Sequence, residues 1–195
     1  MKQENFETQC ADGVKLSGIL LIPEKLKAVV QFNCGTATKK EYYLKFLTYL
    51  AENGYLCCLW NYRWTNESDN LKNRDLSYID YGLKDMPAIK SYLDKRFPHL
   101  PFMLIGHSVG GQQIGFMNNL DNVVGNINIA VSSGYWLYMP FKYRMRAYFF
   151  FYVFSPLSAL VYGYIKAKPY GFMENLPTKF VLEWRKWLGQ KDLFL

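Results

Sequence analysis

Apolar and polar positions in the first third of the chain follow two spacings, one typical of strands and one typical of helices. Two β-compatible runs flank the Asp12-Gly13 pair, which favours a tight type I′ hairpin turn. A short apolar run follows, and apolar residues then recur at helical spacing. We therefore expect a hairpin with strands at 5–11 and 14–22, a buried strand at 28–32 and a helix at 42–50.

The same alternation continues through the middle of the chain. A long amphipathic pattern over 78–97 contains Pro87, which a helix tolerates only with a kink. The expected elements are a strand at 55–60, this kinked helix, a strand ending at 105, a helix at 109–119 and a strand at 127–131. Strands alternating with helices predict an α/β fold with a mostly parallel, doubly wound sheet and helices on both faces.

The pattern changes beyond residue 133. Long aromatic runs are interrupted by prolines, so we assign residues 1–133 to the core and residues 134–195 to a cap of short helices. Residues 147–165 carry no charge over 19 positions. A membrane-spanning helix, a segment bound to a membrane surface and an apolar cap over an acyl pocket are all compatible with that run. Pro156 and Gly163 weigh against the spanning helix.

The composition is that of a globular protein, since 50% of the 195 residues are apolar and 20% are charged. The first six residues lack the basic stretch and apolar run of a secretory signal, so we expect a cytoplasmic protein. The four cysteines show no metal-ligand spacing and are expected to be buried thiols. No metal site and no cofactor are predicted.

The net charge of +7 is unevenly distributed along the chain. Residues 1–133 carry 14 basic and 13 acidic side chains, so the excess lies in the C-terminal segment. There the basic residues flank aromatic runs, a pattern that fits an anionic lipid or acyl surface better than a nucleic-acid track. We therefore expect no nucleic-acid partner. Contact of the cap with a membrane surface and an ordinary solvated face both stay open.

A Gly-x-Ser-x-Gly sequence at residues 106–110 directly follows an apolar strand pattern. Gly106 and Gly110 allow the sharp strand-to-helix turn called a nucleophile elbow, which exposes Ser108 at the carboxyl end of the sheet. Ser108 is therefore the candidate catalytic nucleophile.

An acyl-transfer site also needs two donors for the developing oxyanion. The backbone N–H of Val109, next to the nucleophile, is well placed to be one of them. The second is expected from the loop after the strand at 28–32, where Gly35 would let the Thr36 N–H turn toward a substrate carbonyl. An ordinary glycine turn is the alternative for that loop.

These residues together resemble the α/β-hydrolase superfamily, specifically its serine aminopeptidase and monoacylglycerol-lipase-like branch of bacterial predicted hydrolases. Asn61-Tyr62-Arg63 followed by Ser68 resembles the Asp-Tyr-Arg-Gly-x-Gly-x-Ser segment of that branch, with Trp64 and Asn66 in place of glycines. The segment Gly134-Tyr135-Trp136 resembles the start of its cap. The resemblance implies two further strands bearing the catalytic acid and histidine, and this sequence ends before them.

Neither histidine of the chain is expected to serve as the general base. His107 is adjacent to Ser108, and neighbours across a tight turn point in different directions. His99 precedes the strand whose other end carries Ser108, which places it more than about 15 Å away. A serine hydroxyl without a base is a poor nucleophile at neutral pH.

Two hypotheses for function follow. The first is a serine hydrolase that acts on acyl esters or related substrates through an acyl-Ser108 intermediate, inactive or partner-dependent in this form. The second is a non-catalytic module that binds a lipid or acyl ligand. Because the last core strand would present an uncovered edge, we also expect a homodimer or a partner that adds strands.

Overall fold

The structure is a computed structural model and describes residues 1–38, 40–64, 71 and 75–191. The chain divides into two compact units. The first comprises residues 1–63 and 79–131, and the second comprises residues 64–78 and 132–195. The described residues between 64 and 78 thus group with the helices at the end of the chain.

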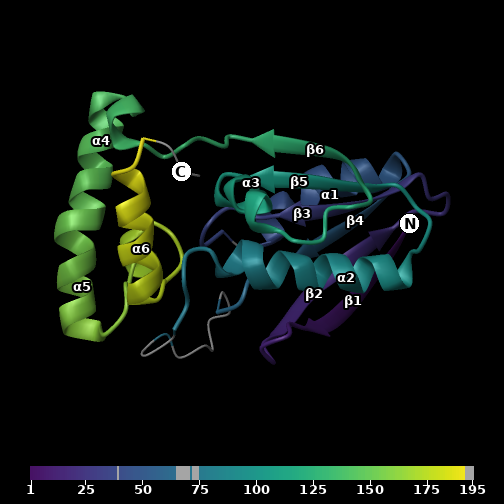
Figure 1. Cartoon of the computed structure of the whole chain (residues 1–195), viewed down its shortest axis with the longest axis horizontal. Coiled ribbons are helices and arrows are strands. Elements are labelled where there is room, and N and C mark those ends of the chain that lie inside the picture. Colours follow the sequence, from purple (N-terminus) through teal and green to yellow (C-terminus); the bar gives the residue numbers. More distant parts are fainter. Residues whose placement is uncertain (39, 65–70, 72–74, 192–195) are drawn as a thin grey trace. The chain divides into compact units, whose positions relative to one another are not determined.

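The first unit is built on a six-stranded sheet with the order β1-β2-β4-β3-β5-β6 (Figure 1). Its first hairpin is antiparallel, as is the pairing of β2 with β4, and the remaining pairs are parallel. The expected α/β class with a mostly parallel sheet is therefore confirmed. The strands are β1 Lys2–Gln9, β2 Lys15–Ile22, β3 Ala28–Asn33, β4 Tyr55–Trp60, β5 Phe102–His107 and β6 Val123–Ile129.

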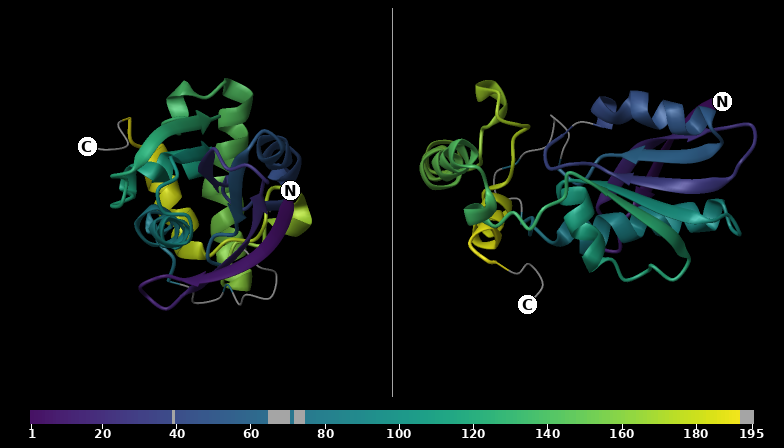
Figure 2. Two further views of the ribbon diagram at one scale, coloured as in Figure 1. Left: turned by 90° about the vertical axis from the view of Figure 1, so that its right-hand side faces the viewer. Right: turned by 90° about the horizontal axis from the view of Figure 1, so that it is seen from above.

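Helices cover both faces of this sheet. Helix α1 (Leu44–Glu52) lies on one face, while α2 (Met86–Arg96) and α3 (Val109–Gln112) lie on the other (Figure 2). Both central strands β3 and β4 are almost wholly buried between the two layers. Short helical turns precede or extend the helices: η1 Lys40–Tyr43, η2 Tyr81–Asp85 and η3 Gln113–Phe116.

Three local expectations about the first unit were wrong. The last strand was expected at 127–131, whereas β6 begins earlier, at Val123, and ends at Ile129. The hairpin turn is not type I′, because only Gly13 has positive φ and its N–H donates to the Cys10 carbonyl, as in a longer loop. The helix after Ser108 ends at Phe116 rather than at Asn119. Asn119 instead donates its side-chain amide to Pro87 O and Ser91 Oγ, bonds that compete with a helical backbone.

The kink expected at Pro87 takes the form of a π-helical turn. Proline has no N–H to donate to the preceding turn, so the regular hydrogen-bond ladder must break there. The five residues of η2 stand just before it, and the Met86 N–H donates to the carbonyl of Tyr81, one residue further back than in an α-helix. The wider turn relieves the clash between the proline ring and the carbonyl of the preceding turn, so the helix continues past Pro87.

The last strand, β6, forms one edge of the sheet. It contains no charged residue, and Val124, Ile127 and Ile129 are 40–68% exposed. Within the described residues its outer edge has no strand partner. An uncharged apolar edge of this kind favours pairing with another strand.

We therefore predict self-association through β6. Replacing Ile127 with lysine is expected to weaken it by about tenfold, since a buried isoleucine contributes roughly 1.5–3 kcal/mol. Sedimentation velocity over a micromolar range measures the effect, with Leu83→Lys on the helical layer as the control. A wild-type chain that stays monomeric throughout this range would contradict the prediction.

The second unit is helical. Helices α4 (Phe141–Tyr148) and α5 (Ser155–Tyr162) are joined without interruption by the π-helical η5 (Phe149–Phe154), and α6 (Thr178–Leu188) lies near the end of the chain. Shorter turns are η4 Trp136–Tyr138 and η6 Lys168–Tyr170. Across the described ranges, no helix combines the length and apolar character needed to cross a membrane.

Aromatic side chains form the core of the second unit. Phe151 of η5 packs edge-on against Trp184 of α6, with ring centroids 5.1 Å apart. The ring of Tyr78 lies against Phe180 and Trp187 of the same helix, at 5.2 and 5.3 Å. The Tyr78 N–H also donates to Glu183 Oε2 at 2.7 Å, which ties residues 75–78 to α6.

Candidate active site

Ser108 stands between the end of β5 and the first residue of α3. Its backbone has φ 52° and ψ −122°, a conformation that non-glycine residues rarely adopt and that costs roughly 1–3 kcal/mol. The Ser108 N–H donates to Ile129 O of β6 at 3.0 Å, and its carbonyl accepts from the Gly111 N–H. These bonds hold the strained turn in place.

Glycines around Ser108 allow very close backbone contacts. A Cβ at Gly106 would stand 2.4 Å from Gly111 Cα, and one at Gly110 would stand 2.1 Å from the Asn33 carbonyl oxygen. Neither glycine has positive φ, so what they contribute is the absence of a side chain. They let the elbow fold tightly and bring the loop after β3 against it, while the strained φ belongs to Ser108 itself.

The loop after β3 is tied to the elbow by a chain of hydrogen bonds. The Gly35 N–H donates to Tyr43 Oη at 3.0 Å, and Tyr43 Oη lies 2.8 Å from His107 Nδ1. Burial lowers the pKa of His107 and so favours its neutral ring. In that form Nδ1 can accept a hydrogen bond from the Tyr43 hydroxyl. A Cβ at Gly35 would be 2.7 Å from the same nitrogen, so this glycine is required for close approach.

Two backbone donors beside this junction are candidates for the oxyanion hole. Within the described residues, the Thr36 N–H makes no backbone hydrogen bond, and the buried Thr36 Oγ1 has no partner. The Val109 N–H lies in the first turn of α3, where the helix itself offers no acceptor. Both groups are therefore available to a ligand atom.

Neither histidine is placed to act as the general base for Ser108. His107 directs Nδ1 to Tyr43 rather than serving as a free acceptor. His99 precedes β5 in the chain, so the whole of that strand, about 20 Å at 3.3 Å per residue, separates it from Ser108. Ser68 and Asn66 of the quoted loop motif lie outside the described residues.

A buried ionic cluster fixes the loop after β4, and sequence reasoning missed it. Arg63 donates to Asp85 Oδ1 from Nε at 2.6 Å and from its own backbone N–H to Oδ2 at 3.0 Å. Its Nη1 also donates to Asp12 Oδ2 at 2.7 Å. Burial raises the pKa of Asp85 to about 6, although the charge and hydrogen bonds of Arg63 act in the opposite direction.

The four cysteines are free and buried. Burial raises the pKa of Cys10 and of Cys57 to about 12, and it raises that of Cys34 as well. Thiols held in the neutral form are poor nucleophiles, so Cys34 is a packing residue beside the site. In the described part of the chain, no group of histidine, cysteine and acidic side chains could hold a metal ion.

Comparison with known families identifies this arrangement. Residues 24–131, more than half of the chain, match the family model described as serine aminopeptidase, S33. The chain belongs to this family. The match to the S33 family covers β3 to β6 and includes both the elbow and the loop after β3. It also confirms the expected branch of the α/β-hydrolase superfamily. No curated protein matches the chain.

Solved structures with the same fold are distant in sequence. A carboxyl esterase from Bacillus coagulans is 20% identical with a TM-score of 0.58, over 66% of this chain and 44% of that one. An esterase from Pyrococcus furiosus is 18% identical with a TM-score of 0.58, over 74% and 56%. The α/β hydrolase GrgF from Penicillium sp. sh18 is 19% identical with a TM-score of 0.52, over 67% and 46%. The chain thus spans about half the length of these proteins.

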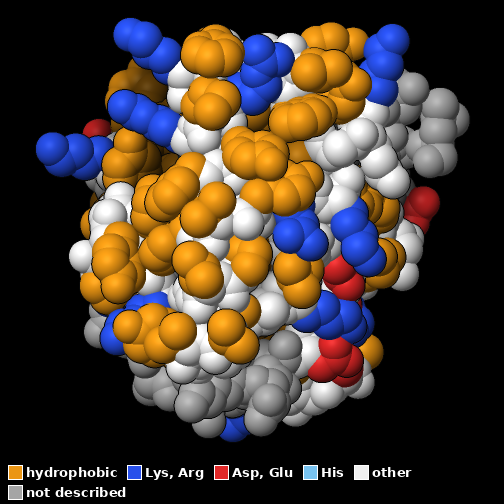
Figure 3. Space-filling view, turned by 90° about the vertical axis from the view of Figure 1, so that its left-hand side faces the viewer, with side chains coloured by type: hydrophobic (Ala, Val, Ile, Leu, Met, Phe, Trp, Pro, Cys, Tyr) orange, Lys and Arg blue, Asp and Glu red, His pale blue; other side chains and the backbone are white. Residues whose placement is uncertain are grey.

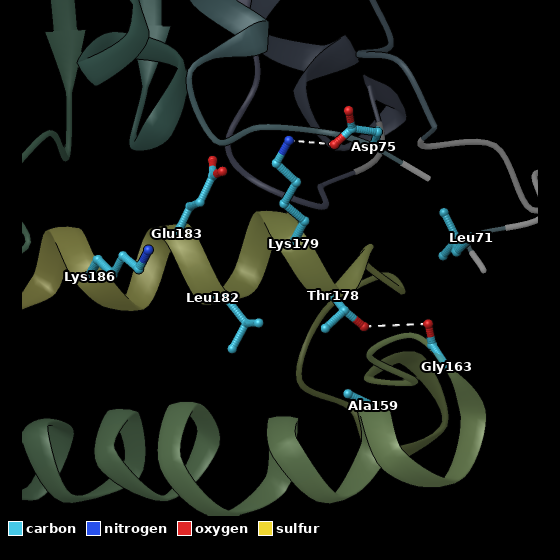
Figure 4. Close-up of a pocket in the computed structure, with 9 residues that line it drawn as sticks. All are labelled: Leu71, Asp75, Ala159, Gly163, Thr178, Lys179, Leu182, Glu183 and Lys186. Carbon is cyan, nitrogen blue, oxygen red and sulfur yellow. Dashed lines mark hydrogen bonds and ion pairs between the residues drawn. The ribbon is translucent and has the colours of Figure 1, made fainter. Parts of the chain in front are cut away.

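The second unit contains a cavity of about 620 Å³, which is lined by residues of α5 and α6 and by Leu71 and Asp75. Figure 4 shows Lys179 paired with Asp75 and the Thr178 hydroxyl directed at the Gly163 carbonyl. Glu183 accepts from Ser77 and from the Tyr78 N–H. Because these polar groups already form hydrogen bonds or an ion pair with neighbouring residues, we assign this cavity a structural role rather than a catalytic one.

Proposed function

We propose that the first unit is the nucleophile-bearing core of a serine hydrolase that cleaves acyl esters or related substrates. Ser108 Oγ would attack the acyl carbonyl carbon, and the Thr36 and Val109 N–H groups would stabilise the oxyanion. The leaving group would depart with a proton, and water would then hydrolyse the acyl-Ser108 ester. The observation that supports this most is the strained backbone of Ser108 at the β5–α3 turn.

The general base is proposed to come from outside these 195 residues, on another segment or a partner chain. Positioned general bases contribute roughly 10²–10⁴-fold to rate. We therefore expect Ser108 in this chain alone to react slower than in a completed site by about that factor.

A second candidate is a non-catalytic module that holds an acyl or lipid ligand, with Ser108 as a hydrogen-bond donor. The involvement of His107 Nδ1 with Tyr43 favours it, because no histidine of the chain is then free to activate the serine. The two candidates differ in whether Ser108 can form a covalent bond to an electrophile.

Labelling with a fluorophosphonate probe, with and without added imidazole, tests the proposal. We expect slow labelling of the purified chain that rises at least about tenfold with imidazole as a diffusible base, and none in Ser108→Ala. The exposed Ser91→Ala variant is the matched control and should label like the wild type. Labelling that survives Ser108→Ala, or that stays absent at high imidazole, would reject the nucleophile role and favour the binding module.

A further inference from the structure

An apolar stripe runs along the continuous helix formed by α4, η5 and α5. Its members recur every fourth residue and are each 40–69% exposed. They are Phe141, Met145, Phe149, Val153, Leu157 and Val161. Tyr148, Tyr152 and Leu160 extend the stripe sideways and are also exposed. Side chains this apolar, gathered on one helix face, indicate an interaction surface.

The opposite side of the same helix already has its packing partners. Phe150 and Phe151 are buried against Phe172 and Trp184, with ring centroids 5.4 and 5.1 Å apart. Ser158 is buried too and accepts from the Lys166 N–H. The stripe is therefore not needed for the core of the second unit.

The helix that carries the stripe and the residues next to it contain charges of a single sign. Residues 122–173 contain no aspartate or glutamate, and five basic residues stand at the two ends of the helix: Lys142, Arg144, Arg146, Lys166 and Lys168. Lys142 and Arg146 make no ion pair within the described part of the chain. Figure 3 shows apolar side chains spread over this face, with lysine and arginine side chains at its upper end and a mixture of basic and acidic side chains along its right side. A positively charged rim calls for an anionic partner.

A second cavity of the helical unit, about 630 Å³, opens beside the N-terminal half of the stripe. Its lining is mainly aromatic, including Phe149, Phe150 and Phe172, and Arg146 stands among these rings. Such a cavity can take an alkyl chain while the guanidinium binds a phosphate or carboxylate. This combination fits an amphiphile better than a folded protein surface.

We infer that this face binds the surface of an anionic phospholipid bilayer. The helix lies flat, with the stripe among the acyl chains near the headgroups and the exposed tyrosines at the level of the interface. Lys142, Arg146 and Lys166 contact the phosphates, while Lys168 pairs with Glu174. This binding is separate from any reaction at Ser108.

Vesicle flotation tests the inference directly. We expect the purified chain to float with phosphatidylcholine vesicles containing about one-third phosphatidylglycerol, and to be released as salt is raised. The double variant Lys142→Gln, Arg146→Gln should bind about 25-fold more weakly, at roughly fivefold per basic residue. Phe149→Ser and Leu157→Ser should each weaken binding by about tenfold.

Matched variants in the first unit act as controls. Lys25→Gln with Lys45→Gln removes two exposed charges, and Tyr42→Ser removes an exposed ring; all should bind like the wild type. Equal binding to pure phosphatidylcholine, or no binding to either vesicle, would overturn the inference. So would a dimer that Leu157→Ser dissociates in sedimentation while vesicles stay unbound, since a second copy would then cover the face.

Discussion

Replacing Arg63 with methionine is expected to destabilise the chain by about 3–5 kcal/mol. The substitution keeps much of the aliphatic volume but leaves Asp85, which is fully buried, without its counter-charge. It also removes the link to Asp12 in the hairpin turn, so of these bonds the loop after β4 keeps only the one from the backbone N–H of residue 63 to Asp85. Urea unfolding monitored by tryptophan fluorescence measures the loss.

The loss should depend on pH in a defined direction. Burial already raises the pKa of Asp85 to about 6, above its unfolded value, and removing Arg63 raises it further. The folded state then binds a proton that the unfolded state does not, so stability contributed by this group falls as pH rises. We expect Arg63→Met to be more damaging at about pH 8 than at about pH 5.5.

Two further variants test this explanation. Arg96→Met removes a partly exposed arginine that pairs with Glu4, and it should cost no more than about 1 kcal/mol. Adding Asp85→Leu to Arg63→Met should recover part of the lost stability, because no charge is then left buried. Equal losses of unfolding free energy for Arg63→Met and Arg96→Met would show that the buried Arg63–Asp85 pair stabilises the chain no more than an exposed ion pair does.

Replacing Gly110 with alanine is expected to destabilise the first unit by about 1–3 kcal/mol or more, through overpacking against backbone. The new Cβ would stand 2.1 Å from Asn33 O and 2.6 Å from Cys34 O, and neither atom belongs to a flexible side chain. The loop after β3 must therefore move away from the elbow. Chemical unfolding gives the stability change, and amide chemical shifts of Asn33 and Thr36 report the displacement.

Gly125→Ala is the matched control for this variant. Its Cβ would meet only Met103 Cε at 3.5 Å, an ordinary contact, so stability should change by less than about 0.5 kcal/mol. Equal free energies of unfolding for Gly110→Ala and Gly125→Ala, together with an unchanged Thr36 amide shift, would contradict the close contact between the loop after β3 and the elbow.

The sheet and the elbow could be predicted from the sequence because their signals are local. Strand β5 begins with a short apolar run that reaches Ile105, and the motif around Ser108 starts at the next residue. The carboxyl ends of parallel strands meet at one edge, so the loop after β3 could be assigned to the same site. The position of Ser108 follows from this local pattern, whereas the choice of Thr36 rests on the place of its loop in the superfamily that the chain resembles.

The remaining features depend on residues far apart in the chain. Nothing near Arg63 in the sequence indicates that its partners are Asp12, 51 residues before it, and Asp85, 22 residues after it. The close approach of Gly35 to His107 could not be predicted either, because His107 belongs to another strand. Packing partners of this kind are set by the fold and leave no local pattern.

The discontinuous second unit has a consequence for synthesis of the protein. Tyr78 and its partner Glu183 are 105 residues apart, so the ribosome makes one well before the other. At about 5–20 residues per second, Tyr78 waits roughly 5–20 s for α6 to emerge. During that interval a ring that is 2% exposed in the finished structure has none of its aromatic neighbours from α6. The nascent chain therefore presents this segment to chaperones and proteases while the strands on either side of it are already complete.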